Sequence, residues 1–410
     1  MRPVFKQISY TTFSNLLSAP FSLAVSIIAA RVLGASEFGQ YSLVLSISRF
    51  LPIVMGFGIA TAVVRYISKD PDTPEAKRIL STAVILVSML SLAATLVFFF
   101  GGSFFSRMLN VTELIFSVSI VYSLIITITQ FGRSLHQSKK KFFSLSILEV
   151  CNTALSLVSL VVLFYFLGNR TYIGASTATA LGQAPVAIAG IYLLYKCLHR
   201  LEFDFEWAKK IFSYGKYSAV AALSVFLTIA ADKLILNSYF PLATVGIYMA
   251  YFTASQAFTI NYILSAINTV LFPHLSSEDR NAENYSILRK HLLLVLCGVF
   301  ILNLISITVL VHFFGKEFPF ILSLATLFSL SSSLSFGVGL YTVVLNSEDM
   351  RGRRITSYGS LVFALLNVAL NLILIPHYGM YAAAFISLIT NLLYLVTLEI
   401  ASRGANIISK

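Results

Sequence analysis

Long apolar segments alternate with short polar connections along the whole chain. A helix needs about 20 mainly apolar residues to cross the hydrocarbon core of a membrane. The first segment lacks a small-residue cleavage site after a short apolar region, so we expect it to be retained as a span. We predict twelve membrane-spanning helices, at residues 8–31, 41–67, 79–101, 113–133, 143–167, 174–196, 214–239, 246–272, 291–313, 320–345, 356–376 and 381–402.

Two sequence patterns recur at an offset of 207 residues. Arg31–Tyr41 aligns with Ser238–Tyr248, and both segments end in Gly-x-Tyr; Tyr172–Thr177 aligns with Gly379–Ala384. Repeated helical bundles are typical of transporters. We therefore predict an all-α integral membrane protein with two six-helix lobes, related by a pseudo-two-fold axis along the membrane normal. The predicted parts are an N-terminal lobe at 1–197, a cytoplasmic linker at 198–213 and a C-terminal lobe at 214–410.

Basic residues gather in one set of connections. Of the 29 Lys and Arg residues, 23 lie on one side of the predicted membrane and five on the other, while Arg49 lies inside a span. Cytoplasmic loops of membrane proteins are enriched in Lys and Arg, so we expect both termini in the cytoplasm. The same enrichment explains the net charge of +12 without a nucleic-acid partner.

Composition narrows the classes of function. Hydrophobic residues make up 57% of the chain and charged residues 11%, whereas soluble domains have about 25% charged residues. Lipid must therefore solvate most of this chain. The three cysteines are far apart, the six histidines have no ligand spacing, and no large aqueous loop is present. We expect no metal, no other cofactor and no enzymatic activity.

Charged residues inside predicted spans are the candidate functional residues, because charge is costly in hydrocarbon. Arg49 lies about eight residues into the second span, which is roughly 12 Å deep; the alternative to a site role is a salt bridge that fixes helix packing. Asp232 and Lys233 lie in the seventh span. Adjacent helical residues point about 100° apart, so we expect these two side chains not to pair directly.

Arg31 and Glu149 complete the candidates. Arg31 ends the first span, either at headgroup level or at the mouth of a cavity. Glu149 is either a proton carrier or the structural partner of a basic residue on the cytoplasmic side. The cations Arg49, Lys233 and Arg31 suit a phosphate or diphosphate, because Arg binds such oxygens bidentately. Asp232 and Glu149 are the candidates for coupling to H⁺ or Na⁺.

Three motifs resemble a known family. They are Ala30–Tyr41, then Asp232–Asn237 with Val245–Tyr248, and Leu366–Pro376 followed by Tyr378–Ala384. Together they resemble the Wzx-type O-antigen and polysaccharide flippases. That family belongs to the MOP transporter superfamily, which also contains the MATE drug antiporters and the lipid II flippase.

The resemblance implies two six-helix lobes around a cation-lined cavity. It also implies transfer of an undecaprenyl-diphosphate-linked oligosaccharide from the cytoplasmic to the periplasmic leaflet of the bacterial inner membrane, with a polysaccharide polymerase and a chain-length regulator as partners. Two alternatives stay open. The first is a MATE-like cation or drug antiporter, whose chemistry favours buried acids where this chain has Arg49 and Lys233. The second is a glycan polymerase or ligase, which typically needs a large periplasmic loop that this chain lacks.

Overall fold

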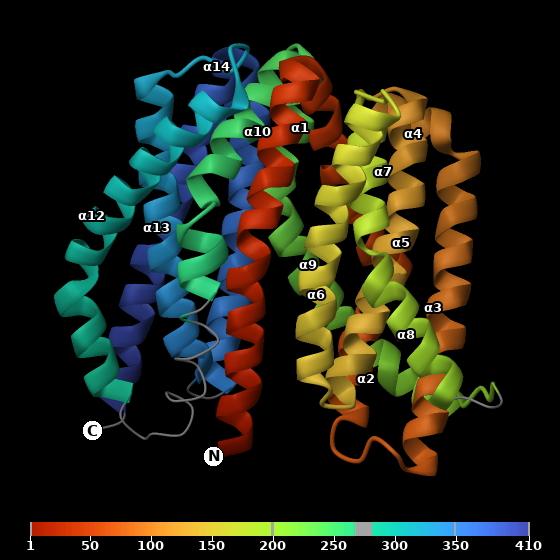
Figure 1. The fold of residues 1–410 in the computed structure, drawn as a ribbon. Helices are drawn as coiled ribbons and strands as arrows, with labels where there is room; N and C mark the ends of the chain where they lie inside the picture. The colour runs from red at the N-terminus through yellow and green to blue at the C-terminus, as the bar shows by residue number, and fades with distance from the viewer. Residues whose placement is uncertain (1, 198–200, 266, 268–280, 348–349, 409–410) are drawn as a thin grey trace. The chain divides into compact units, whose positions relative to one another are not determined.

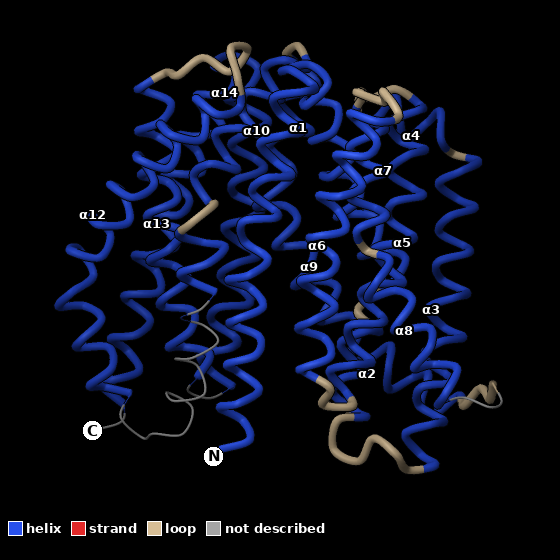
Figure 2. The backbone as a smooth tube through the Cα atoms, in the orientation of Figure 1, coloured by secondary structure: helices blue, strands red, loops and turns tan. Residues whose placement is uncertain are grey.

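The chain is helical throughout its described part. The computed structural model describes residues 2–408 except 198–200, 266, 268–280 and 348–349. Every regular element in these residues is a helix (Figure 2), and nine of the helices are long and apolar enough to cross a membrane. The predicted all-α membrane fold is therefore confirmed.

The helices form two compact units. The first unit comprises Met1–Leu33 and Gln40–Phe226, and the second comprises Gly34–Gly39 and Leu227–Lys410. The helices up to the middle of the chain are α1 (Arg2–Gly56), α2 (Ile59–Ile67), α3 (Pro74–Phe100), α4 (Gly102–Met108), α5 (Glu113–Ser138), α6 (Phe142–Val161), the π-helical η1 (Val162–Phe166), α7 (Tyr172–Gly182) and α8 (Ala184–Cys197) (Figure 1). They are followed by α9 (Phe205–Tyr239), α10 (Leu242–Gln256), the π-helical η2 (Thr259–Leu264), α12 (Asn281–Phe314), α13 (Leu322–Ser347) and α14 (Met350–Ile408).

Two of the nine spanning helices each cover parts of two predicted spans, and the second span of α1 continues into α2. The backbone of α1 leaves helical geometry at Gly34 (φ 72°), between spans 8–31 and 41–67, and that of α14 does so at Gly379 (φ 58°), between spans 356–376 and 381–402. A positive φ favours glycine because glycine has no Cβ. Counting α1 and α14 twice gives eleven spans in the described part of the chain. The described residues of the twelfth, 246–272, contain α10 and η2, while residues 266 and 268–272 of this prediction lie outside the described part. The twelve-span architecture is confirmed.

Each unit is built around the helix of its fourth predicted span. In the first unit, α5 contacts α2, α3, α4, α6, α7 and α8. In the second, α13 contacts α10, η2, α12 and α14 (Figure 1). The corresponding predicted spans, 113–133 and 320–345, begin 207 residues apart, so the sequence repeat coincides with a repeated pattern of packing.

The glycines of the repeated Gly-x-Tyr motifs lie against each other within the second unit. A Cβ on Gly39 would lie 2.1 Å from the carbonyl oxygen of Leu242, and one on Gly246 would lie 1.9 Å from that of Ala35. Gly39 and Gly246 are 207 residues apart, as are Ala35 and Leu242. The contact is thus reciprocal, as expected between two copies of one motif, and only glycine permits this approach.

One end of the first unit, which we call its basic end, contains Lys77, Lys139 and Lys196. It has its own hydrophobic core, formed by α2, α3, α5, α8 and α9. Helix α3 begins sharply, because the Thr73 hydroxyl accepts a hydrogen bond from the Ala76 amide at 3.2 Å and Pro74 is the first helical residue. The described part of the predicted linker packs on this helix. The amides of Glu202 and Asp204 donate to the hydroxyls of Ser81 and Thr82, at 2.5 and 3.0 Å.

Candidate substrate site

The first unit places Arg49 beside two buried tyrosines. Arg49 lies on α1 and is exposed, and it interacts electrostatically with Tyr122 of α5 and Tyr41 of α1. Both tyrosine side chains hydrogen-bond with Thr179 of α7. The two tyrosines and Thr179 thus connect α1, α5 and α7 close to the guanidinium of Arg49.

A second arginine, Arg133 of α5, lies at the other end of the same polar cluster. Its Nε donates to Glu149 Oε1 at 2.5 Å and its Nη2 to Oε2 at 3.1 Å. The same Nη2 donates to Gln183 Oε1 at 3.3 Å, and Gln183 in turn hydrogen-bonds with Tyr122. The predicted pairing of Glu149 with a basic residue is confirmed, and the partner is Arg133.

These contacts form one polar path through the first unit, from Arg49 through Tyr122 and Gln183 to Arg133 and Glu149. It contains two guanidinium groups and one carboxylate, so its charged groups carry one net positive charge. Because Glu149 occupies the fork of Arg133, the guanidinium of Arg49 is the better placed of the two for an anionic ligand.

In the second unit, Asp232 and Lys233 are buried together on α9, with side chains 3% and 2% exposed. Lys233 Nζ lies 3.4 Å from Asp232 Oδ1, so our expectation that these neighbours would not pair was wrong. The flexible lysine stem reaches back one helical turn, and its ammonium also donates to the Ile229 carbonyl. The carboxylate of Asp232 accepts from the Tyr248 hydroxyl and from the Lys233 amide.

Aromatic rings cover the buried ammonium of Lys233. Its Nζ lies 3.8 Å from the ring centroid of Phe252 and 5.7 Å from that of Tyr248. Such cation–π contacts stabilise a desolvated cation. The pair is therefore neutral overall and enclosed, in contrast to Arg49 and to Arg31, which are both exposed on α1.

The tyrosines of the repeated motif have matching roles in the two units. Tyr41 hydrogen-bonds with Thr179, and Tyr248 hydrogen-bonds with Ser387 as well as with Asp232. Thr179 and Ser387 each follow the second repeated pattern, at 172–177 and 379–384. The Gly-x-Tyr repeat therefore marked these positions, whereas Tyr122 and Arg133 had no such signal, and sequence reasoning missed them.

Metal-binding geometry is absent from the part of the chain that the structure describes: it contains no group of three His, Cys, Asp or Glu side chains placed to hold an ion. The first unit offers guanidinium, hydroxyl and amide groups around Arg49 and Arg133, and the second unit separately contains the buried pair of Asp232 and Lys233. Guanidinium and hydroxyl groups bind anions and sugar hydroxyls.

Known proteins resemble this chain over most of its length. A profile of the family described as "Polysaccharide biosynthesis protein" matches residues 4–279. An uncharacterized membrane protein of Methanocaldococcus jannaschii is 24% identical over 93% of this chain and 94% of its own length.

Two further relatives have names that describe a role. The succinoglycan biosynthesis transport protein ExoT of Rhizobium meliloti is 22% identical over 70% of this chain and 56% of its own. The probable low-salt glycan biosynthesis flippase Agl15 of Haloferax volcanii is 26% identical over 44% of this chain and 39% of its own.

Solved structures resemble the fold. An inward-facing multidrug resistance MATE family transporter of the MOP superfamily has a TM-score of 0.72 at 15% identity, covering 96% of this chain and 98% of that chain. This likeness confirms the predicted MATE-like fold.

Proposed function

Because the chain belongs to the polysaccharide biosynthesis protein family, a family of membrane transporters and flippases, we propose that it moves a lipid-linked oligosaccharide across the membrane. The proposed substrate is an undecaprenyl-diphosphate-linked repeat unit, carried from the cytoplasmic to the periplasmic leaflet of the inner membrane by alternating access. Both termini are then cytoplasmic, which agrees with the 23 basic residues in the connections of that side.

The exposed Arg49 is the observation that carries this proposal. A guanidinium presents a planar fork of donors that matches two phosphate oxygens. Tyr41 and Tyr122 hold hydroxyl groups next to it, and Arg31, also exposed on α1, is the proposed contact nearer the end of the span. In this role Arg49 binds the diphosphate while the polyprenyl chain stays in lipid.

Lys233 contacts the substrate only when Asp232 releases it, because the ammonium is buried on that carboxylate. We therefore assign the first contact with the diphosphate to Arg49, and to Asp232 the coupling of H⁺ or Na⁺ binding to exposure of Lys233. The membrane potential adds a driving force of roughly 2.3 kcal/mol per charge per 100 mV for an anion that moves outward.

The test is complementation of a strain that lacks the gene, with Arg49→Ala and Arg49→Lys variants. Loss of a charged bidentate contact is worth about 1.5–3 kcal/mol, so we expect Arg49→Ala to lower surface polysaccharide about 10- to 100-fold. Arg107→Ala is the matched control, because Arg107 is likewise exposed, on α4. Full polysaccharide with Arg49→Ala at normal expression would refute the assignment.

A MATE-like cation or drug antiporter is the second candidate, favoured by the likeness to multidrug resistance transporters. The acid that such chemistry needs would be Asp232, which here is neutralised by Lys233. Normal polysaccharide in the deletion strain together with altered resistance to cationic drugs would support the antiporter and contradict the flippase.

A further inference from the structure

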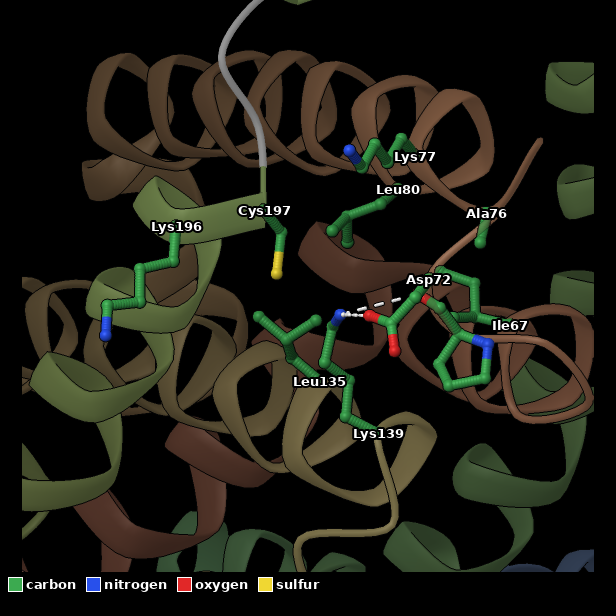
Figure 3. A pocket seen from close by; sticks show the side chains of 10 residues that line it. Ile67, Asp72, Ala76, Lys77, Leu80, Leu135, Lys139, Lys196 and Cys197 are labelled. Atoms are coloured by element: carbon green, nitrogen blue, oxygen red, sulfur yellow. Dashed lines mark hydrogen bonds and ion pairs between the residues drawn. The ribbon is translucent and has the colours of Figure 1, made fainter. Parts of the chain in front are cut away.

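The basic end of the first unit contains a pocket that is separate from the polar path of Arg49. It has a volume of about 200 Å³ and lies where α2 ends, α3 begins, and α5 and α8 end (Figure 3). One wall is apolar, formed by Ile67, Leu80 and Leu135 of the hydrophobic core at this end. Lys77 of α3, beside Leu80, and Lys139 of α5, beside Leu135, also line the pocket, and the Lys139 ammonium reaches its middle (Figure 3).

Lys139 is the cation at the centre of the pocket. Its Nζ donates to Asp72 Oδ1 at 2.7 Å and to the Pro71 carbonyl at 3.3 Å. The Lys139 side chain is only 14% exposed, whereas that of Asp72 is 86% exposed. The carboxylate is thus free to swing into solvent, while the ammonium is fixed in the pocket wall and would remain for another anion.

The charges around Asp72 favour an anion at this place. The hydrogen bond from Lys139 lowers the pKa of the Asp72 carboxyl, and the nearby charges of Lys141 and Lys77 lower it further. Burial alone would lower the pKa of Lys139, but its contacts with Asp72 and Cys197 outweigh burial and raise it. Lys139 is therefore protonated in its pair with Asp72, and Lys77 and Lys141 add positive charge near this carboxylate.

The apolar wall distinguishes this pocket from a solvated basic loop. It lies at the ends of spanning helices, where the hydrocarbon of a membrane gives way to headgroups. Basic pockets at this depth between spanning helices suit anionic lipid headgroups, with the phosphate on the lysines.

We propose that this pocket binds a phosphate group, carried by an anionic phospholipid or free in solution, with Lys139 and Lys77 as its ligands and Asp72 as the counter-ion that it displaces. The site lies in the first unit alone and does not depend on transport of an oligosaccharide. Lys196 lines the pocket with its stem only, because its ammonium lies 4.6 Å from the ring centroid of Tyr192.

Cys197 provides a reporter inside the pocket. Its sulfur points toward the Lys139 ammonium (Figure 3), and the other two cysteines, Cys151 and Cys297, are exposed. Replacing both with Ser leaves Cys197 as the single reactive thiol of the full-length protein. The rate at which a soluble maleimide labels Cys197 then measures access to the pocket.

The experiment compares this protein in phosphatidylcholine nanodiscs with and without phosphatidylglycerol, and adds inorganic phosphate in a third arm. We expect phosphatidylglycerol to slow labelling, and Lys77→Gln or Lys139→Gln to weaken that protection about fivefold each. Lys140→Gln is the matched control, because it removes the same surface charge from the residue next to Lys139, outside the pocket lining.

Each outcome decides between sources or overturns the site. Protection by phosphatidylglycerol alone identifies a lipid phosphate, and equal protection by inorganic phosphate identifies a soluble one. The proposal would be overturned if neither phosphatidylglycerol nor inorganic phosphate slowed labelling of Cys197. It would also be overturned if Lys77→Gln were protected as well as the control variant Lys140→Gln. Lys77 is exposed, so its variant folds even if Lys139→Gln does not.

Discussion

Replacing Lys233 with Met would leave the carboxylate of Asp232 buried without its cation. Breaking a buried ion pair from one side costs about 3–5 kcal/mol. Asp232 would keep two hydrogen-bond donors, the Tyr248 hydroxyl and the residue 233 amide. We therefore expect the lower end of that range, a loss of about 3 kcal/mol in the free energy of unfolding.

The double variant Asp232→Asn/Lys233→Met separates loss of charge balance from loss of packing. Both side chains are almost fully buried, and replacing a whole buried pair by neutral groups of similar size is often nearly neutral. We expect the double variant to recover most of the stability lost by Lys233→Met, measured by denaturant unfolding in detergent micelles. Lys209→Met, at an exposed position of the same helix, is the control. Wild-type stability in Lys233→Met, or no recovery in the double variant, would refute this reasoning.

Three further predictions concern other contacts. Gly246→Ala should destabilise the protein by about 1–3 kcal/mol, because the new methyl group would meet a helix backbone. Gly102→Ala is the control and should not destabilise it, because a Cβ there would have no atom within 4 Å. Thermal unfolding of both variants tests this prediction. Asp72→Asn should lower the unfolding midpoint slightly at neutral pH, and the difference should vanish as the pH falls through the lowered pKa of Asp72; a difference that persists in acid would contradict it. Glu149→Gln should lower the free energy of unfolding by less than about 1 kcal/mol, because the side chains of Glu149 and Arg133 are about a third exposed. The same variant should leave the pH dependence of transport unchanged. A changed pH profile would instead indicate that Glu149 carries a proton.

The spans were predictable because hydrophobic thickness fixes their length. The breaks at Gly34 and Gly379 fall in the gaps between predicted spans, where the apolar runs are interrupted. The repeat in the sequence also identified Tyr41 and Tyr248 by position, although not by contact. Apolar runs and repeated motifs can both be read directly from a single sequence, without knowledge of how the helices pack.

The contacts of the site were less accessible to the same reasoning. Arg133 was not among the predicted site residues, although it lies within α5 and pairs with Glu149. The pairing of Asp232 with Lys233 was missed because helical geometry describes where Cβ atoms point, not how far a lysine stem bends back. Partners 16 to 50 residues apart depend on helix packing, which a single sequence does not specify.

Transport of a lipid-linked oligosaccharide by purified protein is the central measurement. In liposomes that contain an undecaprenyl-diphosphate oligosaccharide, a membrane-impermeant glycosidase reports the fraction of headgroups in the outer leaflet over time. We predict that wild-type protein speeds exchange between leaflets and that Arg49→Ala slows this exchange about 10- to 100-fold, while Arg107→Ala does not. Exchange no faster than in protein-free liposomes, or equal rates for wild type and Arg49→Ala, would contradict the account.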